Sequence, residues 1–593
     1  MSVAERIKQA AANALKQLYN YEVAAAEVAV NATKPEFEGD YAIVLFAYIK
    51  PLKTSPDKLG NEIGEWLLQH HQDLYSRYNV IKGFLNLTIS DEYWLSFLQQ
   101  NYTVADFGLS KKTDHKVMVE YSSPNTNKPL HLGHLRNNFL GWSVAEILNA
   151  KGADIVKTCL VNDRGIHICK SMIAWQLFAN GATPESAGKK GDHFVGDYYV
   201  KFNDEYKRQV AELITSGMSE AEAEKEAPIM KAARQMLLDW EAGKPEVIEL
   251  WSRMNNWVYA GFDITYKRIG SDFSRVYYES QTYLLGKNLV DIGLQKGVFV
   301  QKEDGSVWVD LTGDGLDEKI VRRKDGTSVY ITQDIGLVIN KYEEYKCDSS
   351  IYVVGDEQNY HLKVLKLIAQ KMELPAADGI HHLSYGMVEL PTGKMKSREG
   401  TVVDADDIVN EMVAIAKQKT EELGKVKDFT EDELKNLYEI LGLGALKFFL
   451  LRVDPKKRMI FNPEESIDFH GFTGPFVQYT HARIKSVLRK LNVDTVQQIA
   501  AGKELLPLEK SVVVVLEQFP AVIDEAAAEF DPSKIAIYVF NLAKTFNSFY
   551  TEHSIANAET EEKKILRLQL SQLTAQVIKT AMGLMGIKVP ERM

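Results

Sequence analysis

Cysteine is scarce in this 593-residue chain: Cys159, Cys169 and Cys347 are too few for a disulfide framework. Long apolar runs are also missing, and none could cross a bilayer. The first six residues lack the apolar core of a signal peptide and carry no lipidation motif. These absences argue against secreted disulfide-rich and membrane-spanning proteins. We expect a cytoplasmic protein with no membrane partner.

An excess of positive charge is missing too. The chain has 70 Lys and Arg against 81 Asp and Glu, which gives a net charge of −11. Any contact with RNA must therefore come from local basic patches. The 45% apolar and 25% charged content is ordinary for a globular protein. A chain of this length exceeds what one core supports, so we expect several domains.

The stretch from residue 117 to residue 156 predicts a strand, a helix and a second strand. Residues 117–119 form an apolar run, and apolar residues recur at helical spacing from 135 to 148. Gly152 ends the helix, and residues 155–156 open the next strand. This order is the first βαβ unit of a parallel sheet, in which ligands bind outside the carboxyl ends of the strands.

Two histidines, His131 and His134, open the predicted helix with Gly133 between them. They face the same side of the first turn, where unpaired backbone N–H groups attract anions. Because Gly133 has no side chain, a phosphate or a flat ring can approach the backbone. This arrangement suits a polyphosphate that gains charge during reaction. The alternatives are a helix cap or a zinc site, but Cys159 and Cys169 form no CxxC pair, so we expect no metal site.

The run from Ser122 to Arg136, SSPNTNKPLHLGHLR, carries a family resemblance. His131-Leu-Gly-His134 resembles the HIGH motif of class I aminoacyl-tRNA synthetases, and the longer run resembles the arginyl-tRNA synthetases. The resemblance implies ATP-dependent attachment of L-arginine to tRNA(Arg) through an arginyl-adenylate, with release of AMP and pyrophosphate. It also implies Mg²⁺ bound with the ATP phosphates and no structural zinc. We expect a monomer.

The expected fold is α/β, with a Rossmann-type parallel-sheet catalytic domain at residues 109–460. A helical insertion interrupts it at about 185–260, where Trp240, Trp251 and Trp257 are expected to be packing anchors. Residues 1–108 are expected to form an N-terminal α+β domain, with strands at 42–48 and 84–89. Residues 461–593 are expected to form an α-helical bundle. The resemblance implies that the N-terminal domain contacts the outer corner of tRNA and that the bundle binds the anticodon.

Three carboxylates, Glu120, Glu279 and Asp334, lie near predicted strand ends, and Tyr330 precedes Asp334 by one helical turn. A carboxylate-lined pocket suits a guanidinium, which donates five N–H bonds in one plane. Taken singly, each acid could equally be a surface residue or a helix cap. The resemblance implies that Tyr330 and Asp334 hold the guanidinium, with Glu279 or Glu120.

The resemblance also implies that Asn125 and Gln358 hold the α-amino and carboxylate groups of arginine. The full set of arginine-binding residues expected from it is Glu120, Ser122, Asn125, Glu279, Tyr330, Asp334 and Gln358.

Residues 386–403 predict a strand, a flexible loop and a second strand. The loop resembles the KMSKS motif, although Ser397 occupies the position of the second Lys and Arg398 follows it. A solvated basic turn is the alternative. In the family a Lys just upstream of the HIGH motif is thought to substitute, so the cation that meets the β- and γ-phosphates is Lys128, Lys396 or Arg398. With His131 and His134, these are the expected catalytic residues.

The ATP-binding residues expected from the resemblance lie in the two nucleotide elements. They are Pro124, Asn127, Lys128, His131, Leu132, Gly133, His134, Met387, Val388, Lys394, Met395, Lys396 and Ser397.

The segment 476–490 predicts a helix with a basic face and an apolar face. An aromatic side chain there could stack on a base. The resemblance implies that Tyr479, Arg483, Lys485 and Arg489 contact tRNA, whereas charge alone favours a solvated helix face.

Several alternatives stay open at this point. Residues 162–165 either line a site or form a tight turn, and Asp325-Gly326 predicts a hairpin. Another class I synthetase, such as a cysteinyl or glutamyl type, is one rival function. A non-catalytic RNA-binding paralogue is another, but such a protein is expected to lose HIGH-motif residues.

Overall fold

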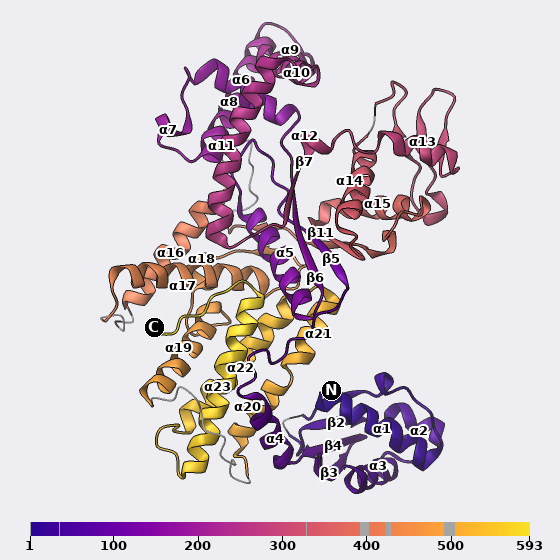
Figure 1. Ribbon diagram of the computed structural model, residues 1–593, viewed down its shortest axis with the longest axis vertical. Coiled ribbons are helices and arrows are strands. Elements are labelled where there is room, and N and C mark those ends of the chain that lie inside the picture. Colours follow the sequence, from indigo (N-terminus) through magenta and orange to yellow (C-terminus); the bar gives the residue numbers. More distant parts are fainter. Residues whose placement is uncertain are drawn as a thin grey trace.

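The computed structural model describes residues 2–34, 36–327, 329–391, 403–422, 424, 428–491 and 504–593. A central parallel sheet has a helical lobe above it and a helical bundle below it (Figure 1). The N-terminal module lies beside the bundle, away from that upper lobe (Figure 1). Within the described residues, no helix is long and apolar enough to cross a membrane.

The central sheet has five strands in the order β12-β11-β5-β6-β7, all parallel. From β5 the chain moves outward to β6 and β7, then returns to place β11 on the other side of β5. The strand order therefore reverses between β5 and β11, which is where open α/β sheets bind ligands. The strands are β5 (Lys116–Glu120), β6 (Asp154–Val161), β7 (Arg275–Tyr278), β11 (Ser349–Gly355) and β12 (Ile380–Tyr385).

The predicted βαβ unit is confirmed as β5, α5 (Leu132–Ala150) and β6. Residues 117–119 are at most 2% exposed, as expected for a parallel strand covered on both faces. Helix α5 is buried on nearly every side, which explains its high apolar content. Gly152 follows the helix with φ +95°, and a Cβ there would lie 2.1 Å from the Lys111 carbonyl oxygen. Only glycine fits this turn without strain.

Helices fill the chain between β6 and β7 and form the upper lobe in Figure 1. The three tryptophans named above do pack there: Trp240 lies edge-on to Trp251 at 5.6 Å, and Trp257 contacts Trp175 at 6.0 Å. The helices are α6 (Ile166–Phe178), α7 (Pro184–Ala187), α8 (Gly191–Thr215), α9 (Glu220–Glu226), α10 (Pro228–Glu241) and α11 (Pro245–Ile269).

A second lobe lies between β7 and β11 and contains a small antiparallel sheet of order β10-β9-β8. The hairpin predicted at Asp325-Gly326 is wrong. The Asp325 carboxylate accepts bonds from the backbone and hydroxyl of Thr327 at 2.9 and 2.7 Å, which makes a local turn. A helix, not a strand, then starts at Tyr330. This lobe comprises α12 (Glu279–Thr282), α13 (Lys287–Gln295), β8 (Phe299–Gln301), β9 (Val307–Val309), β10 (Lys319–Arg322) and α14 (Tyr330–Tyr345).

After β11 the chain forms α15 (Asn359–Lys371), β12 and the short strand β13 (Val388–Glu389). Strand β13 pairs in parallel with β14 (Met459–Ile460), which lies about seventy residues further along the chain. The predicted second strand was expected to end by residue 403, and helix α16 (Ala405–Glu422) starts two residues later. Residues 392–402 lie outside the described residues.

The C-terminal bundle packs against both other parts of the chain. Lys510 of the bundle pairs with Asp40 of the N-terminal module at 2.9 Å. The backbone N–H of Val3 in that module donates to the Glu517 carboxylate of the bundle at 2.7 Å. The bundle and its connection comprise α17 (Glu431–Leu451), α18 (Pro463–Ser466), α19 (Gly474–Lys490), α20 (Pro507–Glu517), α21 (Phe519–Glu529), α22 (Ser533–Glu552) and α23 (Glu561–Leu584).

The N-terminal module is a four-stranded antiparallel sheet of order β1-β2-β4-β3, covered by helices. The strand expected at 42–48 ends at Val44, because α2 starts at Phe46 and takes over its apolar residues. The elements are α1 (Val3–Tyr19), β1 (Val30–Ala32), β2 (Tyr41–Val44), α2 (Phe46–Leu52), α3 (Pro56–His70), β3 (Tyr75–Ile81), β4 (Phe84–Ile89) and α4 (Asp91–Asn101).

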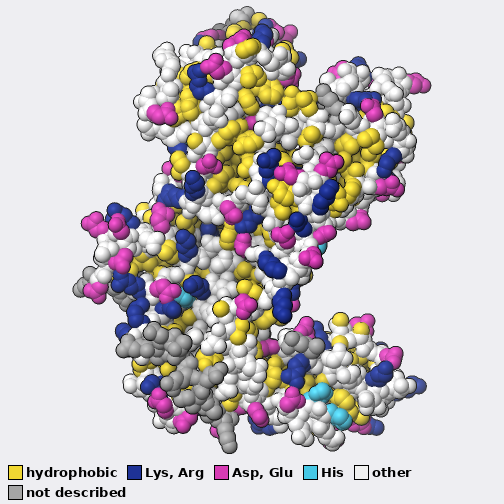
Figure 2. Space-filling view, in the orientation of Figure 1, with side chains coloured by type: hydrophobic (Ala, Val, Ile, Leu, Met, Phe, Trp, Pro, Cys, Tyr) yellow, Lys and Arg dark blue, Asp and Glu magenta, His cyan; other side chains and the backbone are white. Residues whose placement is uncertain are grey.

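The visible surface carries no large area of one charge. Figure 2 shows Lys and Arg interspersed with Asp and Glu, and hydrophobic side chains across the upper lobe.

Candidate active site

The two histidines interlock at the first turn of α5. His131 is the N-cap, and its Nδ1 accepts from the Gly133 N–H at 3.2 Å. The His131 N–H donates to Nδ1 of His134 at 3.1 Å, and the ring centroids lie 3.9 Å apart. A Cβ on Gly133 would lie 3.1 Å from the His131 ring, so glycine lets that ring fold back over the turn. The capping alternative is therefore present, and it organises the pair.

Burial makes both rings neutral, and these hydrogen bonds set which nitrogen carries the proton. Burial lowers the pKa of His131 to about 3 and that of His134 well below its ordinary value, and the Lys128 charge adds to both effects. Both rings are thus neutral near pH 7. Since each Nδ1 accepts a hydrogen bond, each Nε2 carries the proton. The turn presents two Nε2–H donors, and Lys128 is close enough to act on both rings.

The loop between β5 and α5 is built from buried polar contacts. Ser122 has φ +85°, and its N–H donates to Asn137 at 2.6 Å. Its hydroxyl contacts Tyr266 at 2.7 Å and accepts from Asn138 at 3.1 Å. Ser122 was expected to bind arginine, but its hydroxyl is already engaged on both sides. Its evident contribution is to fix the loop that leads to the histidines.

Glu120, at the end of β5, forms a buried ion pair with Lys341 of α14. Glu120 is 7% exposed and Lys341 is 2% exposed. Thr158 also donates to the Glu120 carboxylate at 3.5 Å. The negative charge of Glu120 is therefore balanced within the chain, by a partner that no local sequence pattern predicts.

Glu279 and Asp334 lie near one another although they come from different elements. Burial raises the pKa of Glu279, while Arg164 opposes the shift and the Asp163 and Asp334 charges add to it. The Glu279 carboxylate makes no hydrogen bond within the part of the chain that the structure describes. A half-buried, unpaired carboxylate is a natural partner for a substrate cation.

Asp334 lies in α14 and contacts His361 through Oδ2 and Nε2 at 2.6 Å. Its charge reaches Tyr352, which is paired with Glu120 in the register of β11 and β5. Asp334 therefore lies at the same sheet edge as Glu120. Tyr330, one turn earlier, is 73% exposed and makes no hydrogen bond to described residues, so its ring is available to a ligand.

The other residues predicted to bind arginine or ATP differ in how exposed they are. Asn125 is exposed and bridges to Asn162 after β6, and Gln358 is exposed at the start of α15. Asn127 is 4% exposed with no partner for its Oδ1 among the described residues. Pro124 and Leu132 are buried, so only their backbone can face a ligand.

Lys394, Met395, Lys396, Ser397 and Arg398 lie outside the described residues. Met387 and Val388, just before them, belong to the β13 region.

Sequence reasoning left the role of Asp163 open between a site and a turn. Asp163 is 1% exposed, and its carboxylate accepts from the Ser280 backbone and hydroxyl at 2.8 and 2.7 Å. Tyr259 donates to it at 2.8 Å. Asp163 therefore holds the segment that carries Glu279. In the sequence, its position directly after a predicted strand was the only indication that Asp163 lies near the site.

A cluster of charged side chains joins the helical insertion, at Lys190 and His193, to Asp404 and Asp406 at the start of helix α16. His193 contacts Asp404 at 3.2 Å and Asp406 at 3.1 Å, and the Lys190 ammonium contacts Asp406 at 2.5 Å. Asp404 forms an isolated bridge with His131. Asp192, His193 and Asp406 have the spacing of a metal site, but the Lys190 ammonium already contacts Asp192 at 3.0 Å. A cation is therefore built into this cluster.

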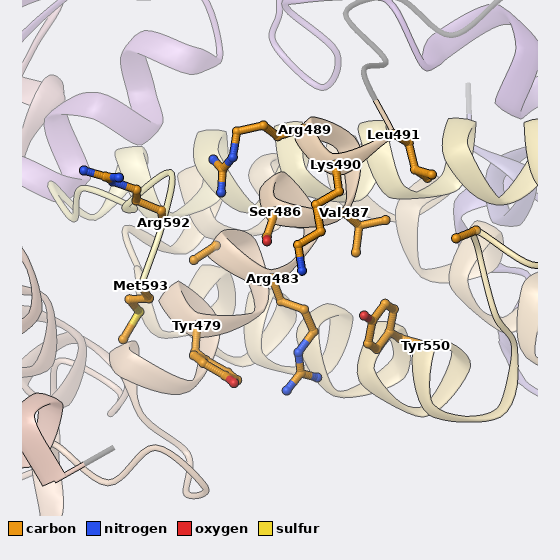
Figure 3. A pocket seen from close by; sticks show the side chains of 12 residues that line it. Tyr479, Arg483, Ser486, Val487, Arg489, Lys490, Leu491, Tyr550, Arg592 and Met593 are labelled. Carbon is orange, nitrogen blue, oxygen red and sulfur yellow. The ribbon is translucent and has the colours of Figure 1, made fainter. Parts of the chain in front are cut away.

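A cavity of about 500 Å³ opens in the C-terminal bundle (Figure 3). Arg483 lies 4.8 Å from the ring centre of Tyr479 and 5.4 Å from that of Tyr550. Arg489 and Arg592 add positive charge to the wall. Stacking aromatic rings beside arginines suit unpaired nucleotide bases.

Of the four residues expected to contact tRNA, Tyr479, Arg483 and Arg489 line this cavity. Lys485 does not, and it pairs with Glu591 at 3.2 Å.

Comparison with known proteins identifies the family. Residues 98–462 match the model "tRNA synthetases class I (R), catalytic domain". Residues 5–89 match the arginyl-tRNA synthetase N-terminal domain, and residues 477–593 match the DALR anticodon binding domain. Similar curated proteins include the arginine–tRNA ligases of Bacteroides thetaiotaomicron and Flavobacterium psychrophilum, each 52% identical over 100% of both chains.

The chain belongs to the arginyl-tRNA synthetases.

Solved structures agree with this fold at lower identity. The arginyl-tRNA synthetase of Thermus thermophilus has a TM-score of 0.80 at 23% identity, and each chain is covered completely. That of Plasmodium falciparum has a TM-score of 0.77 at 17% identity, with 100% and 99% covered. The family assignment confirms the class I Rossmann-type fold with an N-terminal domain and a C-terminal helical domain.

Proposed function

We propose that this protein attaches L-arginine to tRNA(Arg) at the expense of ATP through an arginyl-adenylate, releasing AMP and pyrophosphate. One observation carries the proposal: two neutral imidazoles open helix α5 at the strand-order reversal, at the same edge of the sheet as the carboxylates of Glu279 and Asp334. The full-length likeness to arginine–tRNA ligases supports it.

In the first step the arginine carboxylate attacks the α-phosphate of ATP and pyrophosphate leaves. Such chemistry depends on positioning and on stabilising charge in the transition state. His131 and His134 would donate Nε2–H bonds to phosphate oxygens as their charge grows, and the α5 N-terminus adds its backbone donors. Lys128, Lys396 or Arg398 would meet the departing pyrophosphate.

Arginine would lie with its guanidinium between Glu279 and Asp334 and its polar head near the histidines. Tyr330 would cover the guanidinium, and Asn125 and Gln358 would hold the α-amino and carboxylate groups. Lysine would leave carboxylate acceptors unpaired at this position, which is costly.

Mg²⁺ would accompany ATP and be held mainly by the phosphates. Asp404, which bridges to His131, and Asp406 both already contact His193. The residues present therefore fit a phosphate-held ion better than one held by protein ligands. No structural zinc site is proposed.

In the second step a terminal ribose hydroxyl of tRNA attacks the arginyl group. We propose that residues 461–593 receive the anticodon in the cavity around Tyr479 and that residues 1–108 contact the outer corner of tRNA. One chain supplies both the cleft and the cavity, so we propose a monomer. A cytoplasmic location fits three free cysteines and a role in translation.

Aminoacylation of total tRNA with each labelled amino acid tests the function. Only arginine is expected to be transferred, and transfer of a different amino acid would refute the proposal. Binding of tRNA without any transfer would favour a non-catalytic RNA-binding protein.

A further inference from the structure

Arg164 carries a positive charge beside the pocket proposed for a substrate cation. It directly follows Asp163, whose carboxylate holds Ser280, the neighbour of Glu279 in the chain. The Arg164 guanidinium lies 4.0 Å from the ring centre of Tyr283, which ends the short helix that Glu279 begins. Like charges repel, so a resident cation next to the site of a substrate guanidinium needs an explanation.

The Arg164 side chain is held by three neighbours. A terminal nitrogen pairs with Glu241, at the end of α10, at 3.0 Å. The guanidinium also lies 5.2 Å from the ring centre of Trp240, and that ring lies 5.9 Å from the ring of Tyr283. The side chain is only 12% exposed, and its Nε makes no hydrogen bond to the described residues. Arg164 is therefore packed between the helical insertion and the second lobe, in a fixed place relative to Glu279.

The acids that face Glu279 come from two other elements. Asp163 follows β6, and Asp334 lies on α14, where it contacts His361 of α15 at 2.6 Å. Burial is the largest influence on the pKa of Glu279 and raises it, and the charges of Asp163 and Asp334 raise it further. The Arg164 charge acts in the opposite direction. Because a nearby cation favours an ionised carboxylate, Arg164 supports the charged form of Glu279 before any substrate binds.

We propose that Arg164 is a positioning residue that keeps the Glu279 carboxylate charged in the empty pocket, so that the pocket selects a cationic side chain. The inference rests on the proposed function. Arg164 then has two opposing effects on arginine. It supports the charge of Glu279 only where that group would otherwise take up a proton, whereas it repels the substrate guanidinium at every pH. The ion pair with Glu241 keeps the Arg164 guanidinium from occupying the pocket itself.

Arg164→Met tests this inference, because methionine can still pack against Tyr283 and Trp240 but carries no charge. The measurement is the KM for arginine in ATP–pyrophosphate exchange with tRNA present, from about pH 5.5 to about pH 8.5. The rise in KM on acidification should begin about one pH unit higher in the variant than in the wild type. Near pH 8.5, where Glu279 is ionised in both proteins, the KM of the variant should be about twofold lower because the repulsion is gone. The two curves should therefore cross.

Two further variants separate charge from packing. Arg164→Lys keeps a cation at this position, so its KM should follow the pH course of the wild type. Arg253→Met is the matched control, since Arg253 pairs with Glu249 at 2.6 Å within α11 of the same insertion. Its curve should coincide with that of the wild type. If Arg164→Met raises the KM by one factor at every pH, or if Arg164→Lys shifts as Arg164→Met does, Arg164 only supports the fold and the inference is overturned.

His361 offers a second route to a pH dependence, because histidine side chains titrate in this range and His361 contacts Asp334. Glu279→Gln separates the two routes, since it removes the ionisable group through which Arg164 is proposed to act. In the Glu279→Gln background, Arg164→Met should no longer move the pH dependence. A shift that persists there would assign it to Asp334 and His361 and reject the inference.

Glu241→Gln provides a second test if Arg164→Met does not fold. Removing this acid leaves the Arg164 charge unopposed, so the rise in KM should begin at a lower pH than in the wild type. A shift to higher pH, or no shift, would reject the inference. If the wild-type protein itself shows no exchange with arginine at any pH, the proposed function fails instead.

Discussion

The backbone N–H of His131 donates to Nδ1 of His134 at 3.1 Å, and this bond decides which nitrogen of His134 can donate. With Nδ1 occupied as an acceptor, Nε2 carries the proton in the neutral ring. Helix capping and transition-state binding are therefore not competing roles for this residue. One nitrogen caps the helix, and the other is available to ATP.

Substituting His134 separates these two roles. Asparagine places an acceptor near the Nδ1 position, whereas glutamine places its amide near Nε2. We expect His134→Asn to lower kcat about 10²–10³-fold, the usual cost of one transition-state donor. His134→Gln should retain more activity, and neither variant should change the KM for arginine much. Equal losses in kcat and in arginine affinity would contradict a transition-state role.

Glu279→Gln should raise the KM for arginine about 10- to 100-fold, because a charged hydrogen bond to the guanidinium is lost. The KM for ATP should be unchanged. Glu343→Gln is the control, since Glu343 is exposed on helix α14 with Asp334. The measurement is steady-state exchange kinetics, and an unaltered KM for arginine would exclude Glu279 from the pocket.

The raised pKa of Glu279 predicts a pH dependence. Only the ionised carboxylate attracts a guanidinium, and burial makes this group take up a proton at higher pH than an ordinary Glu. The KM for arginine should therefore rise as pH falls from 7 towards 5. Glu279→Gln should remove that part of the rise. A profile that is the same in both proteins would assign the dependence to another group.

Substitutions in the Glu120–Lys341 ion pair test whether Glu120 binds arginine or only stabilises the folded protein. Glu120→Gln should destabilise the protein by about 3–5 kcal/mol, because Lys341 would be left buried and charged. Glu120→Gln with Lys341→Met should recover much of the melting temperature. If the stable double variant still has a raised KM for arginine, Glu120 also contacts the substrate. A normal KM would limit Glu120 to its structural role.

In the C-terminal cavity, Arg483→Ala should weaken tRNA(Arg) binding about tenfold. The substitution removes the cation held against Tyr479 and Tyr550 and so reduces both stacking and phosphate attraction. Lys544→Ala, exposed on helix α22 outside the cavity, is the control. Filter binding at several salt concentrations would measure both. Equal affinities would place the tRNA contact elsewhere.

Local patterns predicted the elements that carry the site but not the contacts that tie them together. The apolar run at 117–119 and the helical spacing after it identified β5 and α5, and the two histidines marked the helix start. Arg136 contacts a carbonyl 250 residues away, and Lys341 meets Glu120 across 221 residues. Periodicity within a segment cannot pair residues at such separations.

The wrong hairpin at Asp325-Gly326 has a similar cause. The turn itself forms, but the partner of β10 is the earlier strand β9, and the residues after the turn become helix α14. A turn signal fixes where the chain bends, whereas the pairing depends on which strand is already nearby.

The most direct test is a structure of the protein with a non-hydrolysable arginyl-adenylate analogue. The guanidinium should lie within hydrogen-bonding distance of Glu279 and Asp334, and a phosphate oxygen should lie within that distance of Nε2 of His131 or His134. A guanidinium bound away from both carboxylates, or a phosphate beyond reach of both imidazoles, would contradict a single cleft built from these elements.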